Sequence, residues 1–200
     1  MRVDKVILKA FISTLSAIVL LFVFMFSVLA LAFPSTMMQL SYDFGRDASS
    51  IRYAQRAYEW FDDTYYMAYA MEVAIGSDNQ EMIEKCGEIV VGDETYFTQY
   101  CEEKQASLPD TVDVRYEDYL YGKIAVAKYE QGKNVEAVNY AFDSLKGGFP
   151  RDNAAVAVFY AASNDKDTVD LIKGKMKEQK SSITDADKAY FDTMLAFMGE

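Results

Sequence analysis

The chain contains no histidine among its 200 residues, and only two cysteines, three prolines and one tryptophan. The lack of histidine excludes Ser-His and Cys-His nucleophilic catalysis, histidine-ligated zinc and haem, and the side chain that usually titrates near neutral pH. The sequence also shows no phosphate-binding loop, no dinucleotide-binding fingerprint and no cluster of metal ligands. We therefore predict that the protein is not an enzyme and binds no cofactor or metal.

Charged side chains are missing from residues 10–33. As a helix rising about 1.5 Å per residue, this run would be about 36 Å long, enough to cross about 30 Å of hydrocarbon. Three bases and one acid precede it, and by the positive-inside rule the more basic side is cytoplasmic. We predict a single-pass protein of the plasma membrane, with residues 1–9 as a short cytoplasmic tail, residues 10–33 as a transmembrane signal anchor and residues 34–200 outside the cytoplasm.

A cleaved secretory signal is the alternative interpretation of the same run. Ala30-Leu31-Ala32 resembles a small-residue cleavage site. The apolar core of a cleaved signal usually has about 7 to 15 residues, and this run is longer. The length favours an uncleaved anchor, and whether cleavage occurs stays open.

Beyond the membrane segment, acids greatly exceed bases. Residues 35–200 hold 17 Lys+Arg and 30 Asp+Glu, within a whole chain of formal net charge −11. Such a surface is a poor electrostatic match for nucleic acid, so we expect no nucleic-acid partner.

Apolar residues recur at three- and four-residue spacing through most of the external part, which predicts an all-α fold. Pro34 is expected to break or kink the chain where it leaves the membrane. The stretch 88–98 also fits a β-hairpin around Gly92-Asp93, but we predict helices there. From glycine, proline and capping residues at the breaks, the predicted helices are 35–44, 47–61, 63–75, 79–91, 93–106, 116–131, 134–146, 151–163, 166–180 and 185–198.

Two segments of the external part repeat the same spacing of small residues. A looser copy runs through Gly76 and a degenerate one through Asn164, at a period of about 31 residues. The residues that define the two best copies are Gly45, Ser50, Ala54 and Ala57 in the first, and Gly132, Ala137, Ala141 and Ser144, at the same offsets, in the second.

A glycine between two amphipathic helices, with small residues in the second, resembles the tetratricopeptide repeat family. The family's helix-turn glycine matches Gly45 and Gly132, and its later small residue matches Ala57 and Ser144. The resemblance implies a right-handed stack of antiparallel helical hairpins, a TPR-like α-solenoid, with a groove that holds peptides or helices. The family's early Trp-Leu-Gly pattern is absent from this chain.

Aromatic residues are abundant, with 15 tyrosines, 13 phenylalanines and one tryptophan, and seven of them crowd into residues 53–69. Tyrosine combines a rigid apolar body with a polar tip, which suits a half-exposed protein-binding surface. Packing between hairpins is the alternative role for these side chains. The predicted partner-contacting residues are Tyr58, Trp60, Tyr65, Tyr66 and Tyr69.

The two cysteines, Cys86 and Cys101, lie on the apolar sides of neighbouring predicted helices, at comparable distances from Gly92. If these helices fold back on each other, a disulfide bond is geometrically feasible, and a location outside the cytoplasm permits it. Two buried, unpaired thiols are the alternative.

These observations predict a membrane-anchored scaffold or adaptor that binds a protein partner, expected to be another membrane or envelope protein. Two alternatives stay open. The chain is an accessory subunit of a membrane complex held mainly through its transmembrane helix, or a carboxylate-based envelope hydrolase, although no pair of acids stands out in the sequence.

Overall fold

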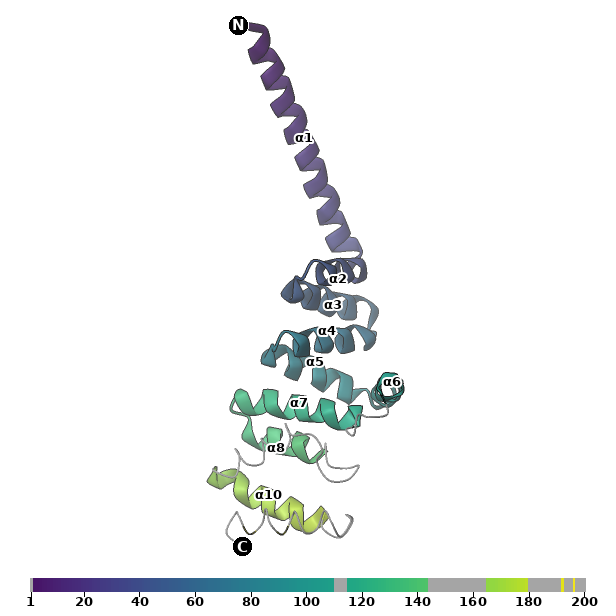
Figure 1. Ribbon diagram of the computed structural model, residues 1–200, viewed down its shortest axis with the longest axis vertical. Helices are drawn as coiled ribbons and strands as arrows, with labels where there is room; N and C mark the ends of the chain where they lie inside the picture. Colours follow the sequence, from purple (N-terminus) through teal and green to yellow (C-terminus); the bar gives the residue numbers. More distant parts are fainter. Residues whose placement is uncertain (1, 110–114, 144–164, 180–191, 193–195, 197–200) are drawn as a thin grey trace. The chain divides into compact units, whose positions relative to one another are not determined.

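The computed structural model describes residues 2–109, 115–143 and 165–179, together with residues 192 and 196. The described residues form helices joined by short connections and contain no strand, in agreement with the predicted all-α fold (Figure 1). The chain divides into two compact units, residues 1–66 and residues 67–200.

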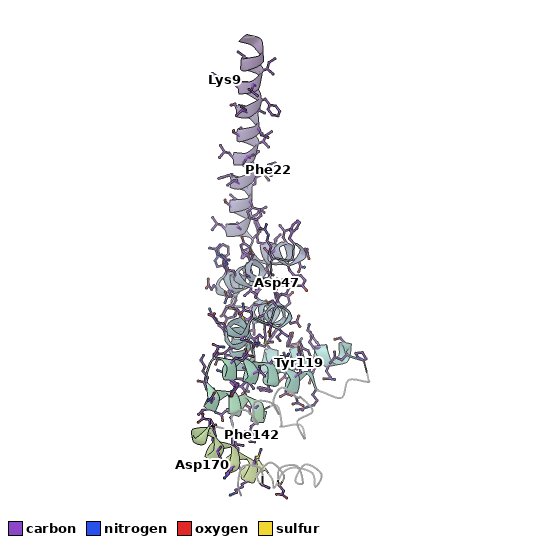
Figure 2. All side chains as sticks on the ribbon, turned by 60° about the vertical axis from the view of Figure 1, so that its left-hand side comes forward. Lys9, Phe22, Asp47, Tyr119, Phe142 and Asp170 are labelled. Atoms are coloured by element: carbon purple, nitrogen blue, oxygen red, sulfur yellow. The ribbon has the colours of Figure 1, made fainter. Side chains whose placement is uncertain are left out.

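The first unit begins with one long apolar helix, α1 (Arg2–Ala32). Its segment Val6–Ala32 has a mean hydropathy of 2.8 and is long and apolar enough to cross a membrane. Nearly all side chains of this segment are exposed, and Phe22 projects from the helix away from the rest of the protein (Figure 2). The structure therefore contains, in the part of the chain it describes, one helix that meets the length and hydropathy of a membrane span.

A helical hairpin follows, made of α2 (Pro34–Asp43) and α3 (Asp47–Phe61), which lie side by side (Figure 1). Pro34 occupies the first turn of α2, where the missing N–H leaves no helical hydrogen bond unmade. The predicted break at Pro34, after the long apolar helix, is thus confirmed. Inside the hairpin, the Ser50 hydroxyl donates to the Met38 carbonyl over 2.9 Å, and Ser50 is fully buried.

The second unit continues the chain as a series of short helices. Helix α4 (Tyr65–Gly76) starts in the last two residues of the first unit. Ser144, Asn164 and the predicted helix 151–163 lie outside the described residues. So does the predicted helix 185–198, apart from residues 192 and 196. Among the described residues of the second unit, the helices that follow α4 are α5 (Gln80–Gly92), α6 (Glu94–Ser107), α7 (Tyr116–Glu130), α8 (Asn134–Asp143) and α10 (Lys166–Gln179).

The prediction of helices rather than a β-hairpin across residues 88–98 is confirmed. Helix α5 ends at Gly92 and α6 begins at Glu94. Asp93 makes this sharp connection stable, because its side chain accepts a 3.1 Å hydrogen bond from the Tyr96 N–H and so caps the start of α6.

Three turns in the chain close with the same hydrogen-bond geometry. A residue with positive φ stands at each turn: Gly45 at 65°, Asp78 at 53° and Gly132 at 76°. The next N–H then donates to a carbonyl five residues back, in the Schellman pattern that ends many helices. These bonds run from Arg46 to Ser41 (2.8 Å), from Asn79 to Ala74 (2.9 Å) and from Lys133 to Lys128 (2.9 Å).

The middle turn corrects one detail of the sequence alignment. The looser copy was predicted to turn at Gly76, but Gly76 is the last residue of α4, and the left-handed position belongs to Asp78. Aspartate tolerates this conformation better than most non-glycine residues, because its short side chain hydrogen-bonds locally. Here the Asp78 carboxylate accepts a 2.7 Å hydrogen bond from the side chain of Gln80.

Aligning the chain on these turns brings small residues into register. Gly87, Ala54 and Ala141 come at the same distance after the turn residues Asp78, Gly45 and Gly132, respectively. All three are buried. At Gly87 the need is steric, since an added Cβ would lie 2.6 Å from the Ile124 Cγ1 of α7. Helices α5 and α7 thus approach closely because Gly87 has no side chain.

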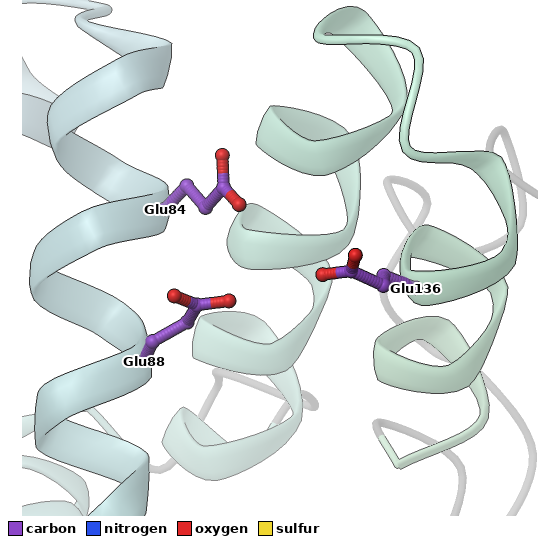
Figure 3. A group of neighbouring side chains, drawn as sticks. All are labelled: Glu84, Glu88 and Glu136. Carbon is purple, nitrogen blue, oxygen red and sulfur yellow. The ribbon is translucent and has the colours of Figure 1, made fainter.

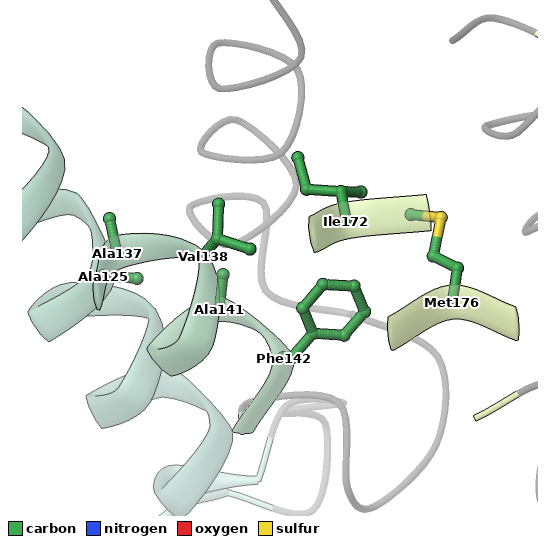
Figure 4. Close-up of a cluster of buried hydrophobic side chains, with 7 residues drawn as sticks. All are labelled: Ala125, Ala137, Val138, Ala141, Phe142, Ile172 and Met176. Atoms are coloured by element: carbon green, nitrogen blue, oxygen red, sulfur yellow. The ribbon is translucent and has the colours of Figure 1, made fainter. Parts of the chain in front are cut away.

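The core at the C-terminal end of the described chain joins α7, α8 and α10 (Figure 4). Small side chains on α7 and α8 bring these two helices together, and larger ones fill the space toward α10. Burial of each large aliphatic or aromatic side chain contributes about 1.5–3 kcal/mol. The cluster consists of Ala125, Ala137, Val138, Ala141, Phe142, Ile172 and Met176.

Candidate protein-binding surface and buried charge clusters

The connection between α3 and α4 is set by two adjacent acids. Asp62 adopts the left-handed conformation (φ 51°), and its N–H donates to the Tyr58 carbonyl over 2.8 Å, which ends α3. The Asp63 carboxylate accepts a 2.9 Å hydrogen bond from the Tyr65 N–H at the start of α4. A negative charge is favourable at this end of a helix, where free N–H groups point outward. The two carboxylates therefore shape a tight turn.

This turn carries four aromatic side chains, Trp60, Phe61, Tyr65 and Tyr66, which we call the aromatic turn. Trp60, Phe61 and Tyr65 are 52%, 55% and 50% exposed. The ring of Tyr66 lies 5.8 Å from the ring of Phe61 and 5.4 Å from that of Tyr65, the latter edge to face. Mutual ring contacts of this kind fix large apolar side chains that would otherwise move freely in water.

The aromatic turn overlaps only in part with the predicted contact residues. The structure brings Tyr65 and Tyr66 together and adds Phe61, which the sequence analysis did not select. Tyr58 is half-buried on α3, and Tyr69 is half-buried within the second unit. One signal in the sequence could have indicated Phe61: it is the last residue of the predicted helix 47–61, and side chains at a helix end are less often covered by a neighbouring helix.

Exposed acids surround the aromatic turn. Glu59, Asp62 and Asp63 are all exposed, and no lysine or arginine occurs in residues 57–84. Lysine and arginine bind over the faces of tryptophan and tyrosine rings through cation–π attraction, and carboxylates add charge-assisted hydrogen bonds. The chemistry of this surface therefore matches a basic and partly apolar segment.

A second cluster, which the sequence analysis missed, joins α5, α7 and α8: Lys128 and Glu84 are buried at its centre, and Glu88 and Glu136 are exposed at its edge. The Lys128 side chain has no exposed surface, and its Nζ lies 3.0 Å from Glu84 Oε1 and 2.5 Å from Glu136 Oε2. It also donates to Glu88. A lysine ammonium has three N–H donors, so three carboxylates satisfy it completely. The Tyr140 ring adds a cation–π contact at 5.3 Å.

Glu84 receives a second cation, because Lys133 Nζ lies 2.5 Å from Glu84 Oε1. Burial by itself would raise the pKa of Glu84, but the hydrogen bonds from Lys133 and Lys128 outweigh it and lower the pKa below its ordinary value of 4.5. Burial likewise opposes the charge on Lys128, and the hydrogen bonds to Glu136, Glu88 and Glu84 reverse this and raise its pKa. Both groups are therefore charged at neutral pH.

Carboxylate oxygens of Glu84, Glu88 and Glu136 lie within 4.8 Å of one another, a spacing that suits a metal ion. Figure 3 shows Glu84 and Glu88 on one helix, with Glu136 reaching toward them from another. The Lys128 ammonium already makes contact with all three. It supplies the positive charge that a metal would bring, so we interpret the cluster as structural.

The sequence did contain a signal for this cluster. Lys128 continues the buried stripe of α7 that runs through Leu120 and Ile124 at four-residue spacing. When the chain is aligned on the turn residues Gly45, Asp78 and Gly132, Lys128 corresponds to Ser41 of the α2–α3 hairpin. Glu84 corresponds to Ile51 of the same hairpin. A lysine in the buried stripe of a helix indicates that an acid must pair with it, but the stripe does not identify the acid.

A third cluster joins α4, α6 and α7. Glu72 Oε1 accepts hydrogen bonds from the hydroxyls of Tyr100 (2.6 Å) and Tyr116 (3.3 Å), and it also pairs with Lys104. Burial, followed by the contact with Glu72, raises the pKa of Tyr100. Burial raises the pKa of Tyr116 to about 12. The two phenols therefore stay protonated and act as hydrogen-bond donors.

Cys86 and Cys101 are buried and carry free thiols, so the disulfide bond considered from the sequence is not formed in this structure. Burial raises the pKa of both thiols to about 12. A nucleophilic cysteine needs a lowered pKa, and these two environments do the opposite.

No family model, curated protein or solved structure that we compared with the chain matches it.

Proposed function

We propose that the protein is a non-catalytic, membrane-anchored adaptor that captures a basic, partly apolar segment of another membrane or envelope protein. The aromatic turn carries this proposal, because three large side chains that are half or more exposed stand together among acids. Exposed aromatic anchors with a polar rim are typical of the centres of protein–protein interfaces.

Anchoring in the membrane defines where the partner segment would be captured. Only the α2–α3 hairpin separates α1 from the aromatic turn. We propose that the N-terminus is cytoplasmic and that residues 34–200 lie outside the cytoplasm, in accordance with the charge distribution around α1. The partner segment would then be bound close to the non-cytoplasmic surface of the membrane that α1 crosses.

We also propose that the hairpins form a stack of the tetratricopeptide type. The three turns of equal geometry support this assignment, and so do the small buried residues at equal offsets after them. In such a stack each hairpin buries an apolar face that it cannot bury alone.

Trp60 provides a direct test of segment capture, since it is the only tryptophan in the chain. A short peptide that combines arginine and leucine should change the Trp60 fluorescence of the full chain in detergent, and a peptide with glutamate in place of arginine should not. Substituting Tyr65 by alanine should weaken the response to the basic peptide by about five- to thirtyfold, as for an interface anchor. The control is Val135→Ala, which removes another half-exposed apolar side chain on α8. Equal responses to both peptides would contradict the proposal.

Replacing residues 10–33 by an unrelated apolar span tests the adaptor proposal against the alternative of an accessory subunit held through its transmembrane helix. A photo-crosslinking residue at position 65 should trap the same partner before and after the replacement. If the replacement abolishes trapping, the transmembrane helix makes the main contact and the adaptor proposal fails.

Topology is tested by labelling. Lys85 is exposed, and the native cysteines are buried, so Lys85→Cys introduces one accessible thiol. A membrane-impermeant maleimide should label this variant in intact cells and leave the wild-type chain unlabelled. Labelling only after the membrane is opened would reverse the proposed orientation.

A further inference from the structure

A groove opens where α1 meets the α2–α3 hairpin, inside the first unit. It has a volume of about 330 Å³, and its walls are mainly apolar. One wall comes from the apolar helix α1 itself, and the rest comes from α2 and the turn that follows it. The residues that line it are Phe26, Met37, Leu40, Ser41, Phe44 and Arg46.

The depth of this groove relative to a membrane follows from α1. Phe26 lies within the segment Val6–Ala32 that can span the bilayer. Arg56 Nη1 donates to the Ala30 carbonyl over 3.3 Å, two residues before α1 ends. An arginine that reaches the end of a membrane helix lies at the boundary between hydrocarbon and head groups. The groove therefore extends from the hydrocarbon edge into the head-group layer.

Arginines are concentrated at this level although the external part of the chain is acidic. Three of the six arginines in the chain, Arg46, Arg52 and Arg56, follow α1 within residues 46–56. Arg46 is exposed at the rim of the groove, and within the described residues no acidic side chain pairs with it. An uncompensated guanidinium beside an apolar groove is suited to a ligand that has an anionic head and an apolar tail.

We propose that this groove binds one phospholipid of the membrane that α1 crosses. The phosphate pairs with the Arg46 guanidinium, whose planar fork matches phosphate oxygens. An acyl chain lies against Phe26, Leu40 and Phe44. Phe44 is 74% exposed, an unfavourable arrangement in water that contact with lipid removes.

This inference depends on α1 as a membrane span and not on the capture of a protein partner. The aromatic turn contributes no side chain to the groove. Loss of peptide binding at Trp60 therefore leaves the lipid site untouched, and loss of lipid binding leaves the peptide response intact.

Native mass spectrometry of the full chain in detergent tests the proposal with three probes: phosphatidylglycerol, phosphatidylcholine and the phosphate-free lipid diacylglycerol. The wild-type chain should retain phosphatidylglycerol about fivefold more strongly than diacylglycerol, which is the effect expected of one arginine near an anionic head group. It should also retain phosphatidylcholine more strongly than diacylglycerol, since both phospholipids offer phosphate oxygens to Arg46. Arg46→Gln should lower phospholipid retention to the level of diacylglycerol. Lys85→Gln, which removes an exposed charge from the second unit, should have no effect. Equal retention by wild type and Arg46→Gln would overturn the proposal.

Leu40→Trp tests the apolar part, because the larger side chain fills the groove. It should lower the retention of all three lipids, whereas Arg46→Gln affects only the phospholipids. Inorganic phosphate in excess should not displace the lipid. Displacement by phosphate would show a site for the free anion and would refute a lipid site.

A measurement on the wild-type chain avoids any effect of the variants on folding. A phospholipid with a photoreactive acyl chain, reconstituted with the full chain, should crosslink mainly to peptides that contain Phe26 or residues 37–46. Crosslinks spread evenly along α1 would show ordinary lipid solvation and would contradict a defined site.

Discussion

The ammonium of Lys128 lies 3.0 Å from Glu84 Oε1, and neither side chain has appreciable contact with water. The two residues come from α7 and α5, 44 positions apart in the chain. Such a pair holds these helices in one arrangement, because any slip would leave a buried charge without a partner.

Substituting Lys128 by methionine should destabilise the second unit by about 1.5–3 kcal/mol, because Glu84 would lose a charged hydrogen-bond donor while Lys133 still compensates its charge. The double variant Lys128→Ala, Glu84→Ile should recover most of this loss. It installs the apolar residues that stand at the matching positions of the other hairpins, Ala74 and Ile51. Thermal unfolding followed by circular dichroism measures both effects. A double variant that is no more stable than Lys128→Met would show that the pair contributes more than charge compensation.

The same cluster predicts how stability depends on pH. The pKa of Glu84 is lowered in the folded chain from 4.5, so the folded state binds this proton less tightly than the unfolded state. The contribution of Glu84 is therefore present above about pH 4.5 and is lost as the pH falls further, toward the folded pKa. Urea unfolding midpoints measured between about pH 6 and pH 3 should fall less steeply for Glu84→Gln than for the wild-type chain. Parallel curves for the two proteins would exclude Glu84 as the source of the stability lost at low pH.

Gly87 and Gly174 should respond in opposite directions to alanine. At Gly87 a methyl group would meet Ile124 Cγ1 at 2.6 Å, so Gly87→Ala should cost about 1–3 kcal/mol by overpacking. At Gly174, an exposed helical position with nothing within 4 Å, alanine should add about 0.5–1 kcal/mol of stability. The added Cβ would also meet Ile124 Cδ1 at 2.7 Å, and Ile124→Val, which removes that atom, should relieve part of the Gly87→Ala penalty. Additive effects of Gly87→Ala and Ile124→Val in a double-mutant cycle would argue against direct contact.

The native thiols should react slowly with alkylating reagents. Burial raises the pKa of Cys86 and Cys101 from 9.0 to about 12, so the thiolate fraction at pH 8 falls by about a thousandfold. Iodoacetamide should label them at the ordinary rate only after unfolding in urea. Lys85→Cys, exposed one position before Cys86, should be labelled rapidly without urea and serves as the control. Rapid labelling of the folded wild-type chain would mean that the helices open around these thiols.

The positions of the helices could be predicted from the sequence because their signals are local. The predicted range 47–61 coincides with α3, and the ranges 79–91 and 93–106 differ from α5 and α6 by one residue at each end. Spacing of apolar residues, glycine at a helix end and a capping aspartate act within a few residues of chain. Gly45 and Gly132 lie at turns between two helices, as predicted, and both have positive φ.

The candidate site could be predicted only in part. The sequence showed that aromatic residues crowd into residues 53–69. It did not show which of them face outward, because residue spacing does not fix how each helix is rotated about its axis. For this reason the sequence analysis selected Tyr58 and Tyr69 and omitted Phe61. The turn at Asp62 and Asp63 decides which rings meet, and that turn depends on backbone conformation.

The sequence by itself determined the apolar run, the acidic character of residues 35–200 and the succession of short helices, because each follows from composition or from contacts within one or two helical turns. Only the tertiary structure decided that Lys128 meets Glu84, Glu88 and Glu136, that Asp78 takes the place of a turn glycine, and that Phe26 and Arg46 line one groove. Each of these joins residues from different helices or depends on the conformation of one turn residue. Their burial and pairing are therefore properties of packing, which local patterns do not encode.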